Sequence, residues 1–452
     1  MKSSKTLLLQ FLFLSLTHLT VFSLSTSQPT SHHGLENILH KFSQWRDNQL
    51  SSQDTYPNTN TIIACIICFI AATVSTACGV GGGSLFLPIL TIVAGLSLKT
   101  ATAYSSFMVT AGALCYIIDA LFFMEKSPIN YEIVLLSQPC MLLGVSIGVL
   151  CNIMFPEWLI TALFALLLAI TTTKTVQSGC KIWRDETEKE RVEVQVEEGE
   201  SGAEVPLLVD EREGKENGAQ NMVPWKDLVV LVLIWMCFFV LHILLGNKSG
   251  KGVIDIKPCG ITYWLITLSQ IPVAIGFTSY ILYTKKKEHE RADHARGTDK
   301  TCVIKSKLES LPMHVFPVAA ILTGALSGLF GIGGGLLLNP VFLQIGVPPQ
   351  TAAATSSLMV LFSASMSMVQ YILLGVRRIN EAVMYAVVCF VASVVGLMTI
   401  QRVIEKSGRV SFVVFLVSSV MALSTVIITL FGVIDVWRQI TNGEYMGFKL
   451  LC

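Results

Sequence analysis

The sequence predicts an all-α, polytopic membrane protein built from two homologous repeats, and three observations support this fold class. The 452-residue chain is 52% hydrophobic and only 14% charged, whereas a soluble domain carries about 25% charged residues. Apolar runs of about 18 residues or more recur along it, separated by short polar breaks, as in membrane-spanning helices. The block Gly79-Val-Gly-Gly-Gly-Ser-Leu-Phe-Leu-Pro88 returns 252 residues later as Gly331-Ile-Gly-Gly-Gly-Leu-Leu-Leu-Asn-Pro340. We therefore expect two copies of one structural unit.

The similarity continues beyond the glycine-rich block. Thr100-Ala-Thr-Ala-Tyr-Ser-Ser-Phe-Met-Val109 matches Thr351-Ala-Ala-Ala-Thr-Ser-Ser-Leu-Met-Val360 at an offset of 251. Each repeat should therefore hold a first helix broken at the glycines and three further helices. The helices expected from apolar runs are 61–77 continued at 84–96, 100–122, 132–151, 157–176, 225–245, 260–283, a broken element from 311, 350–374, 380–401 and 410–432.

The chain divides by composition into repeats, loops and linking helices. Residues 181–217 are crowded with glutamate and cannot bury a core, which favours a disordered loop. The predicted segments are a signal peptide at 1–25, a polar lumenal segment at 26–60, the first repeat at 61–176, an acidic disordered cytosolic loop at 177–224, two linking transmembrane helices within 225–283, a basic cytosolic loop at 284–310, the second repeat at 311–432 and a C-terminal tail at 433–452.

The N-terminus has the layout of a secretory signal peptide. Lys2 and Lys5 precede an apolar stretch from Leu7 to Leu24, and small residues follow. The alternative is a first helix that is not cleaved. We favour the signal peptide, which places the protein in a membrane of the secretory pathway, either the plasma membrane or an endomembrane.

Two signals in the connecting segments predict the same topology. The basic cluster from Lys285 to Lys307 places that loop in the cytosol. One helix earlier, Asn247-Lys-Ser249 is a glycosylation acceptor that would then be lumenal. If each glycine-broken element crosses twice or returns to its own side, the repeats are inverted; if it crosses once, they are parallel. We favour inverted repeats, because they fit a lumenal start after a cleaved signal.

The glycine-rich blocks are the strongest candidates for a binding site. A glycine costs about 1 kcal/mol relative to alanine in a helix, and backbone freed at membrane depth must line a cavity or be buried in protein. The N–H groups of Gly81–Ser84 and Gly333–Leu336 would then start short helices and could bind an anion. Close helix packing is the simpler explanation for any single glycine, but recurrence of the whole block favours a pocket.

Hydroxyl side chains on the second element of each repeat would complete such a pocket. Asp119 is a candidate for proton coupling, although its spacing of six residues from Glu125 favours an interfacial position. No metal-ligand set is apparent. The prolines at 88 and 340 would help to break the helices. The predicted substrate-binding residues are Gly79, Gly81, Gly82, Gly83, Ser84, Ser105, Ser106, Gly331, Gly333, Gly334, Gly335, Thr355, Ser356 and Ser357.

The two blocks, with the segment Gln138-Pro-Cys-Met-Leu-Leu-Gly-Val-Ser-Ile-Gly148, resemble the TauE/SafE family of sulfite exporters, also called TSUP permeases, and in particular its plant branch. The resemblance covers roughly residues 60–435. It implies a multi-pass permease for sulfite, sulfonates or related small organic anions, without a metal or organic cofactor. It also implies that the glycines of both blocks take part in the site.

The function predicted from these features is secondary transport of a small sulfur-containing anion across the lipid bilayer. The alternative is a non-transporting scaffold or receptor that acts through its cytosolic loops. An enzyme is disfavoured, since no H-E-x-x-H motif, paired intramembrane Asp or Ser/His set occurs. The net charge of +1 gives no argument for nucleic acid. A homo-oligomer and a cytosolic partner for residues 181–217 are compatible with the sequence.

Overall fold

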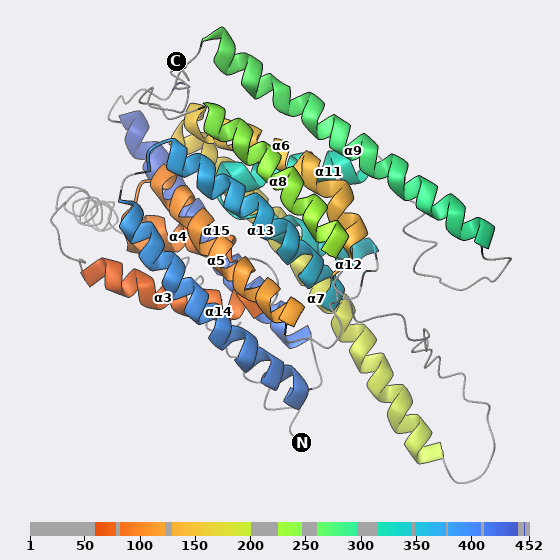
Figure 1. Cartoon of the computed structure of the whole chain (residues 1–452). Helices are drawn as coiled ribbons and strands as arrows, with labels where there is room; N and C mark the ends of the chain where they lie inside the picture. The colour runs from red at the N-terminus through yellow and green to blue at the C-terminus, as the bar shows by residue number, and fades with distance from the viewer. Residues whose placement is uncertain are drawn as a thin grey trace, which may run out of the picture.

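The structure, a computed structural model, is helical throughout the part of the chain that it describes (Figure 1). That part comprises residues 59–77, 82–122, 129–199, 225–245, 260–295, 315–345, 347, 349–376, 378–407, 411–441 and 447. Among these residues, seven helices are long and apolar enough to cross a membrane. The helices are α3 (Thr59–Ala77), α4 (Gly83–Pro88), the π-helix η1 (Ile89–Val93), α5 (Leu98–Phe122), α6 (Tyr131–Met154), α7 (Glu157–Gly199), α8 (Trp225–Leu245), α9 (Ile261–Ala295), α11 (Val315–Phe330), α12 (Gly335–Ile345), α13 (Pro349–Leu373), α14 (Ile379–Ser407) and α15 (Ser411–Thr441).

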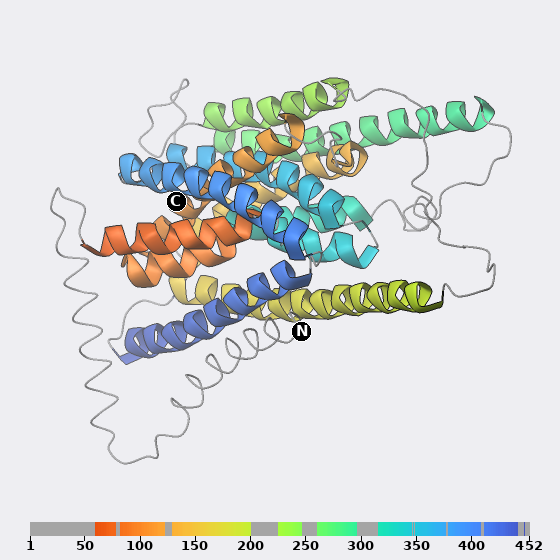
Figure 2. The same cartoon turned by 90° about the horizontal axis from the view of Figure 1, so that it is seen from below.

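The helices match the apolar runs of the sequence closely, but three of them continue into segments predicted as loop or tail, among them α15, which extends to Thr441. The loop predicted from residue 177 is helical as far as Gly199, because α7 continues through it. Its glutamate, lysine, arginine and glutamine residues are all good helix formers, although they cannot build a core. α9 likewise continues past its predicted end to Ala295. The extensions of α7 and α9 project beyond the helix bundle at the same end (Figures 1 and 2).

Several predicted segments lie outside the described residues. They are the signal peptide at 1–25, the lumenal segment to residue 58, Asn247, the remainders of both cytosolic loops and all of the C-terminal tail after Thr441 except residue 447.

The closest helix crossing joins α6 and α11, and glycine makes it possible. A Cβ atom at Gly144 would overlap the carbonyl oxygen of Ile321, and one at Gly324 would overlap the carbonyl oxygen of Met141. Gly148 and Gly328, each four residues further along, face the partner backbone in the same way. Small residues at this spacing let membrane helices approach until their backbones touch. The same device recurs between α14 and α3, where a Cβ at Gly396 would overlap the carbonyl oxygen of Thr73.

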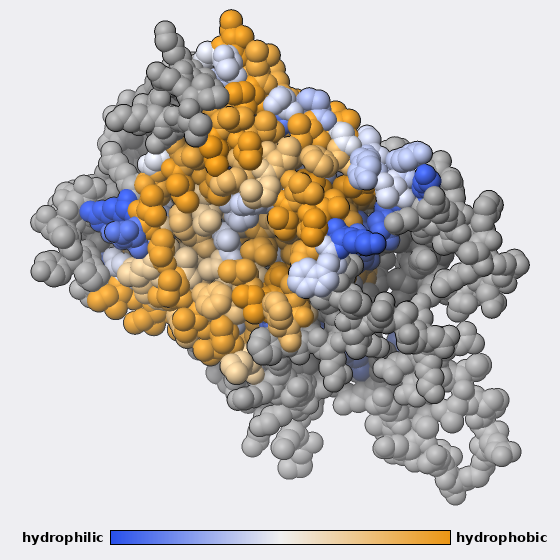
Figure 3. Space-filling model, viewed as in Figure 1, coloured by the Kyte–Doolittle hydropathy of each residue, from blue (hydrophilic) through white to orange (hydrophobic). Residues whose placement is uncertain are grey.

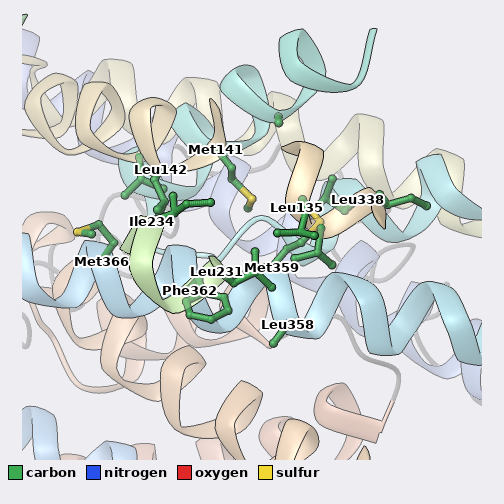
Figure 4. Close-up of a cluster of buried hydrophobic side chains, with 14 of the residues drawn as sticks. Leu135, Met141, Leu142, Leu231, Ile234, Leu338, Leu358, Met359, Phe362 and Met366 are labelled. Atoms are coloured by element: carbon green, nitrogen blue, oxygen red, sulfur yellow. The ribbon is translucent and has the colours of Figure 1, made fainter. Parts of the chain in front are cut away.

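The helices are layered around α6, which is the most deeply buried of the seven long ones. α8 and α9 cover one side of the bundle and are mostly exposed, whereas α7 and α15 lie side by side on the opposite side (Figure 2). The face seen in Figure 3 is largely hydrophobic, as expected of a surface in contact with lipid acyl chains. The core between α6, α8 and α13 is packed with residues such as Met141, Leu231 and Phe362 (Figure 4).

Two hydrogen bonds fix the relative directions of α5 and α13, which pack against each other. Near the start of α5, the Lys99 Nζ donates to the carbonyl oxygen of Ile153 at the end of α6, at 2.7 Å. Near the start of α13, Thr355 Oγ1 accepts a bond from the Asn130 N–H just before α6, at 2.9 Å. The two helices therefore begin at opposite ends of α6 and run in opposite directions.

Candidate functional site

The second glycine block is a tight turn between α11 and α12. α11 ends at Phe330, and the Gly331 N–H still donates to the Ser327 carbonyl at 2.8 Å. Gly331, Gly333 and Gly334 have φ angles of +65°, +73° and +78°. These values lie in the left-handed region, which only glycine adopts without strain. The turn therefore requires glycine at these three positions.

The carbonyl groups around this turn are occupied by side-chain donors from three other helices. α13 supplies Tyr371 and Ser363, α5 supplies Ser105 and α6 supplies Asn152. The bonds are Tyr371 OH to Gly328 O at 2.8 Å, Asn152 Nδ2 to Leu329 O at 2.8 Å, Ser105 Oγ to Gly331 O at 2.9 Å and Ser363 Oγ to Gly333 O at 3.0 Å. The negative ends of these peptide dipoles are thus paired.

The N–H groups of the same turn are unpaired. Residues 332–335 are buried, and their amides have no hydrogen-bond acceptor among the described residues. Gly335 begins α12, so the positive end of that helix dipole adds to the four amides. The carbonyls of Gly331, Gly333 and Gly334 are paired, whereas the amides of residues 332–335 are free, so the turn is electropositive without any basic side chain. Such a turn is suited to an anion.

The first glycine block has the same geometry where the structure describes it. Gly82 has a φ of +65°, and α4 begins at Gly83. The Gly82 carbonyl accepts bonds from the N–H groups of Leu85 and Phe86, just as the Gly334 carbonyl accepts from Leu337 and Leu338. Gly83 and Ser84 are buried. The predicted residues Gly79 and Gly81 lie outside the described part of the chain.

Each block has beside it a buried serine hydroxyl without a partner. Ser75 is 1% exposed and Ser327 is fully buried, and neither hydroxyl has a hydrogen-bond partner within the described residues. Ser75 Oγ lies 2.6 Å from where a Cβ of Gly82 would be, and Ser327 Cβ lies 3.6 Å from the corresponding point at Gly334. An unpaired buried hydroxyl is expensive, so both serines are candidates for binding a ligand.

These two serines are not among the residues predicted from the sequence, although the sequence contains a signal for them. Ser75 and Ser327 are 252 residues apart, the same offset that relates the two glycine blocks. Extending the comparison four residues upstream of Gly79 and Gly331 finds them.

The two blocks are in direct contact. A Cβ at Gly83 would overlap the Cα atom of Ile332. Gly333 is enclosed by Val109 of α5 and Val360 of α13, whose Cγ1 atoms lie 2.6 and 2.7 Å from where its Cβ would be. The candidate site therefore comprises two half-sites that meet where α5 and α13 cross.

The predicted hydroxyls on α5 and α13 surround this point, but most of them have partners within the protein. Ser105 bonds to the Gly331 carbonyl, Ser106 to the Thr102 carbonyl of its own helix at 3.2 Å, and Thr355 accepts from the Asn130 N–H. Ser356 donates to Asn339 Oδ1 of α12, and Ser357 is buried. In this conformation Ser105 holds the second turn directly, whereas the bonds of Thr355 and Ser356 link α13 to α6 and α12.

The remaining predicted residues lie farther from the turns along their helices. Pro88 is the last residue of α4, directly before η1, and Pro340 lies within α12. Asp119 is half-buried, three residues before the end of α5. Its counterpart at an offset of 251 is Gln370. Proton coupling through Asp119 stays a prediction.

We expect Ser105→Ala to destabilise the fold by about 1–3 kcal/mol, because it leaves the buried Gly331 carbonyl without a donor. Thermal unfolding of the purified protein measures this loss. The matched control is Thr110→Val on the same helix, which removes only a bond to the Ser106 carbonyl within α5. Equal unfolding temperatures for the two variants would contradict the assigned role of Ser105.

Comparisons with known proteins agree with the resemblance seen in the sequence. The family model described as "Sulfite exporter TauE/SafE" matches residues 2–175 and 220–435. The chain is 44% identical over 464 residues to Sulfite exporter TauE/SafE family protein 5 of Arabidopsis thaliana, which covers 99% of this chain and 100% of that protein. Family protein 2 of the same plant is 44% identical over 448 residues, or 95% of this chain and 96% of that protein. A probable membrane transporter protein of Haemophilus influenzae is 33% identical over 126 residues, which are 27% of this chain and 46% of that protein. No solved structure matches the chain.

Proposed function

The chain belongs to the sulfite exporter TauE/SafE family, and on this premise we propose that it is a secondary transporter that carries a small sulfur-containing anion across a membrane of the secretory pathway. It is an integral multi-pass membrane protein of a permease family. The names of its relatives point to sulfite, and sulfonates carry the same SO₃ group, a sulfur atom bonded to three oxygens. The observation that carries the proposal is the buried turn at 331–335, where the Gly331, Gly333 and Gly334 carbonyls are paired and the amides of residues 332–335 are free.

The site would bind the anion through backbone amides and the hydroxyls of Ser75 and Ser327. A sulfite or sulfonate group offers three oxygens that can each accept hydrogen bonds from several directions. Neither glycine block contains lysine or arginine, so no fixed cation would hold the anion. Binding by amide and hydroxyl dipoles, without a charged side chain in either block, should be weak enough to allow release on the far side, which a carrier requires.

The architecture proposed for this transport is a pair of inverted repeats. The opposite directions of α5 and α13 support it, because these helices occupy equivalent places in the two halves. The pattern of helix contacts supports it too. α3 packs on α14 as α11 packs on α6, and α4 packs on α15 as α12 packs on α7. Each half thereby supports the other, and rocking of one half against the other would expose the site to each side in turn.

Flux measurement in proteoliposomes tests the proposal. We expect the purified wild-type protein to carry sulfite or an organosulfonate well above the rate of protein-free liposomes, and deletion of residues 200–217 to leave that flux unchanged. The absence of flux for any small anion, with well-folded protein, would contradict the carrier and favour the scaffold reading. Loss of a cellular function on deletion of 200–217, with flux intact, would likewise favour a scaffold.

A further inference from the structure

A buried histidine joins three helices at one rim of the bundle, outside the site described above. His242 lies three residues before the end of α8 and is 6% exposed. Its Nε2 is 2.9 Å from Ser146 Oγ of α6 and 3.0 Å from Gln370 Nε2 of α13. Gln370 Nε2 in turn lies 3.4 Å from Ser146 Oγ. The sequence suggested only a linking helix here, yet three buried polar groups from three helices meet.

No charged side chain lies near this cluster on the helices that pack against α8, which are α6, α9 and α13. On α6 the charged residue is Glu132, about 20 Å from Ser146 along the helix, and on α9 charges begin only at Lys285. The charged residues of α8 itself, Lys226 and Asp227, are at its other end. The other titratable side chains of these helices are Tyr131, Cys140 and Cys151 on α6, Cys237 on α8, Tyr263, Tyr280, Tyr283, His289 and His294 on α9, and Tyr371 on α13; both histidines of α9 come after Lys285.

The contacts of Nε2 require a neutral imidazole. An amide nitrogen can only donate, so Nε2 accepts from Gln370, and the single ring proton sits on Nδ1. Protonation would place a second proton on Nε2, which could then donate but no longer accept. The contact between His242 and Gln370 would be lost until the amide rotated to present its oxygen. A proton bound here therefore changes how α8 is held on α13.

A short physical path connects this cluster to the anion site. Tyr371 follows Gln370 directly, and its hydroxyl donates to the Gly328 carbonyl, three residues before Gly331. Ser363, on the same helix, bonds to the Gly333 carbonyl. A displacement of this part of α13 would therefore act on the turn that holds the free amides. From the other direction, the end of α8 is about one helical turn away, which gives protons a short route from the aqueous rim.

We propose that His242 is a proton-binding site, and that its charge state, acting through Gln370 and Tyr371, makes anion transport depend on pH. This inference rests on the proposed transport function. It assigns to α8 a role in the transport cycle beyond that of joining the two halves.

The test combines a direct readout of the imidazole with the pH profile of flux. In nanodiscs, the ¹⁵N signals of His242, identified by their loss in His242→Gln, should report a proton on Nδ1 at neutral pH and titrate as the pH is lowered. In proteoliposomes, wild-type flux should change several-fold across the pH range in which these ¹⁵N signals titrate. His242→Gln should flatten this profile, whereas the control His289→Gln, beyond the apolar part of α9, should retain it.

A second variant keeps the test decisive if His242→Gln does not fold. Gln370→Glu places a carboxylate beside the imidazole, which favours the charged ring, so the flux profile should move to higher pH. Identical profiles for the wild type, His242→Gln and Gln370→Glu, with flux present, would overturn the inference and leave the transporter standing. If neither the wild type nor any variant shows flux, the proposed transport function is contradicted. The imidazole titration alone then decides whether His242 binds a proton.

Discussion

Replacing both Ser75 and Ser327 by alanine is expected to abolish anion flux while leaving the empty protein as stable as before, or more stable. Both hydroxyls are buried beside the glycine turns and have no partner within the described residues. Removing an unpaired buried hydroxyl relieves a desolvation penalty in the empty protein. The same substitution removes a donor that the bound anion would need. The two effects therefore have opposite signs, which a merely structural serine would not produce.

The expected size of the loss follows from hydrogen bonds to charged groups. Each contributes about 1.5–3 kcal/mol, so each single variant should weaken apparent affinity by roughly 10- to 100-fold. Concentration-dependent flux in proteoliposomes measures the affinity. Thermal unfolding with and without sulfite measures stability, and the stabilisation by the anion should disappear in the double variant.

The matched control for this pair is Ser418→Ala in α15. Ser418 is also buried, but its hydroxyl is bonded to the Val414 carbonyl of its own helix at 2.8 Å. It should leave the affinity unchanged. Wild-type affinity in the double variant would contradict the assignment of the two hydroxyls to the anion site. A large loss of stability in the empty protein would show instead that they support the fold.

The sequence was sufficient to predict the helices, because each is a long apolar run ended by glycine, proline or a polar cluster. It also predicted a break at each glycine block, since repeated glycines disfavour a regular helix; in the described residues α11 ends at Phe330 and α12 begins at Gly335. The extension of α7 to Gly199 was missed for a physical reason. A glutamate-rich segment cannot form a core, but its residues favour the helical conformation, so an existing helix can continue through it in contact with water.

The sequence could not show which polar side chains are free, because their partners come from the other half of the chain. Ser105 is paired with a carbonyl 226 residues away, and His242 with an amide 128 residues away. No local pattern distinguishes Ser105, which has a partner, from Ser327, which has none in the part of the chain that the structure describes. Only the offset of 252 could have singled out Ser75 and Ser327. Such pairing depends on how helices that are distant in the sequence pack against each other.

A second large effect, on the stability of the protein, is expected from substitutions at the crossing of α6 and α11. Gly144→Ala and Gly324→Ala should each destabilise the protein by roughly 1–3 kcal/mol, and the pair combined should impair assembly of the bundle. The new Cβ atoms would overlap the carbonyl oxygens of Ile321 and Met141. These atoms belong to helical backbone, which cannot move aside as a flexible side chain can. The helices would have to separate, and α11 would carry the second glycine turn with it.

Gly276→Ala in α9 is the matched control, because its Cβ would meet nothing within 4 Å. Alanine is favoured over glycine in a helix by about 1 kcal/mol, so this variant should be unchanged or slightly more stable. Thermal unfolding in detergent and the elution profile of each purified variant provide the comparison. If Gly144→Ala were as stable as Gly276→Ala, direct backbone contact between α6 and α11 would be refuted. That contact holds Ser327 and the turn after Phe330 in place. In the Gly144→Ala and Gly324→Ala variants, flux should therefore fall together with stability. In Ser75→Ala and Ser327→Ala, by contrast, flux should fall without a loss of stability.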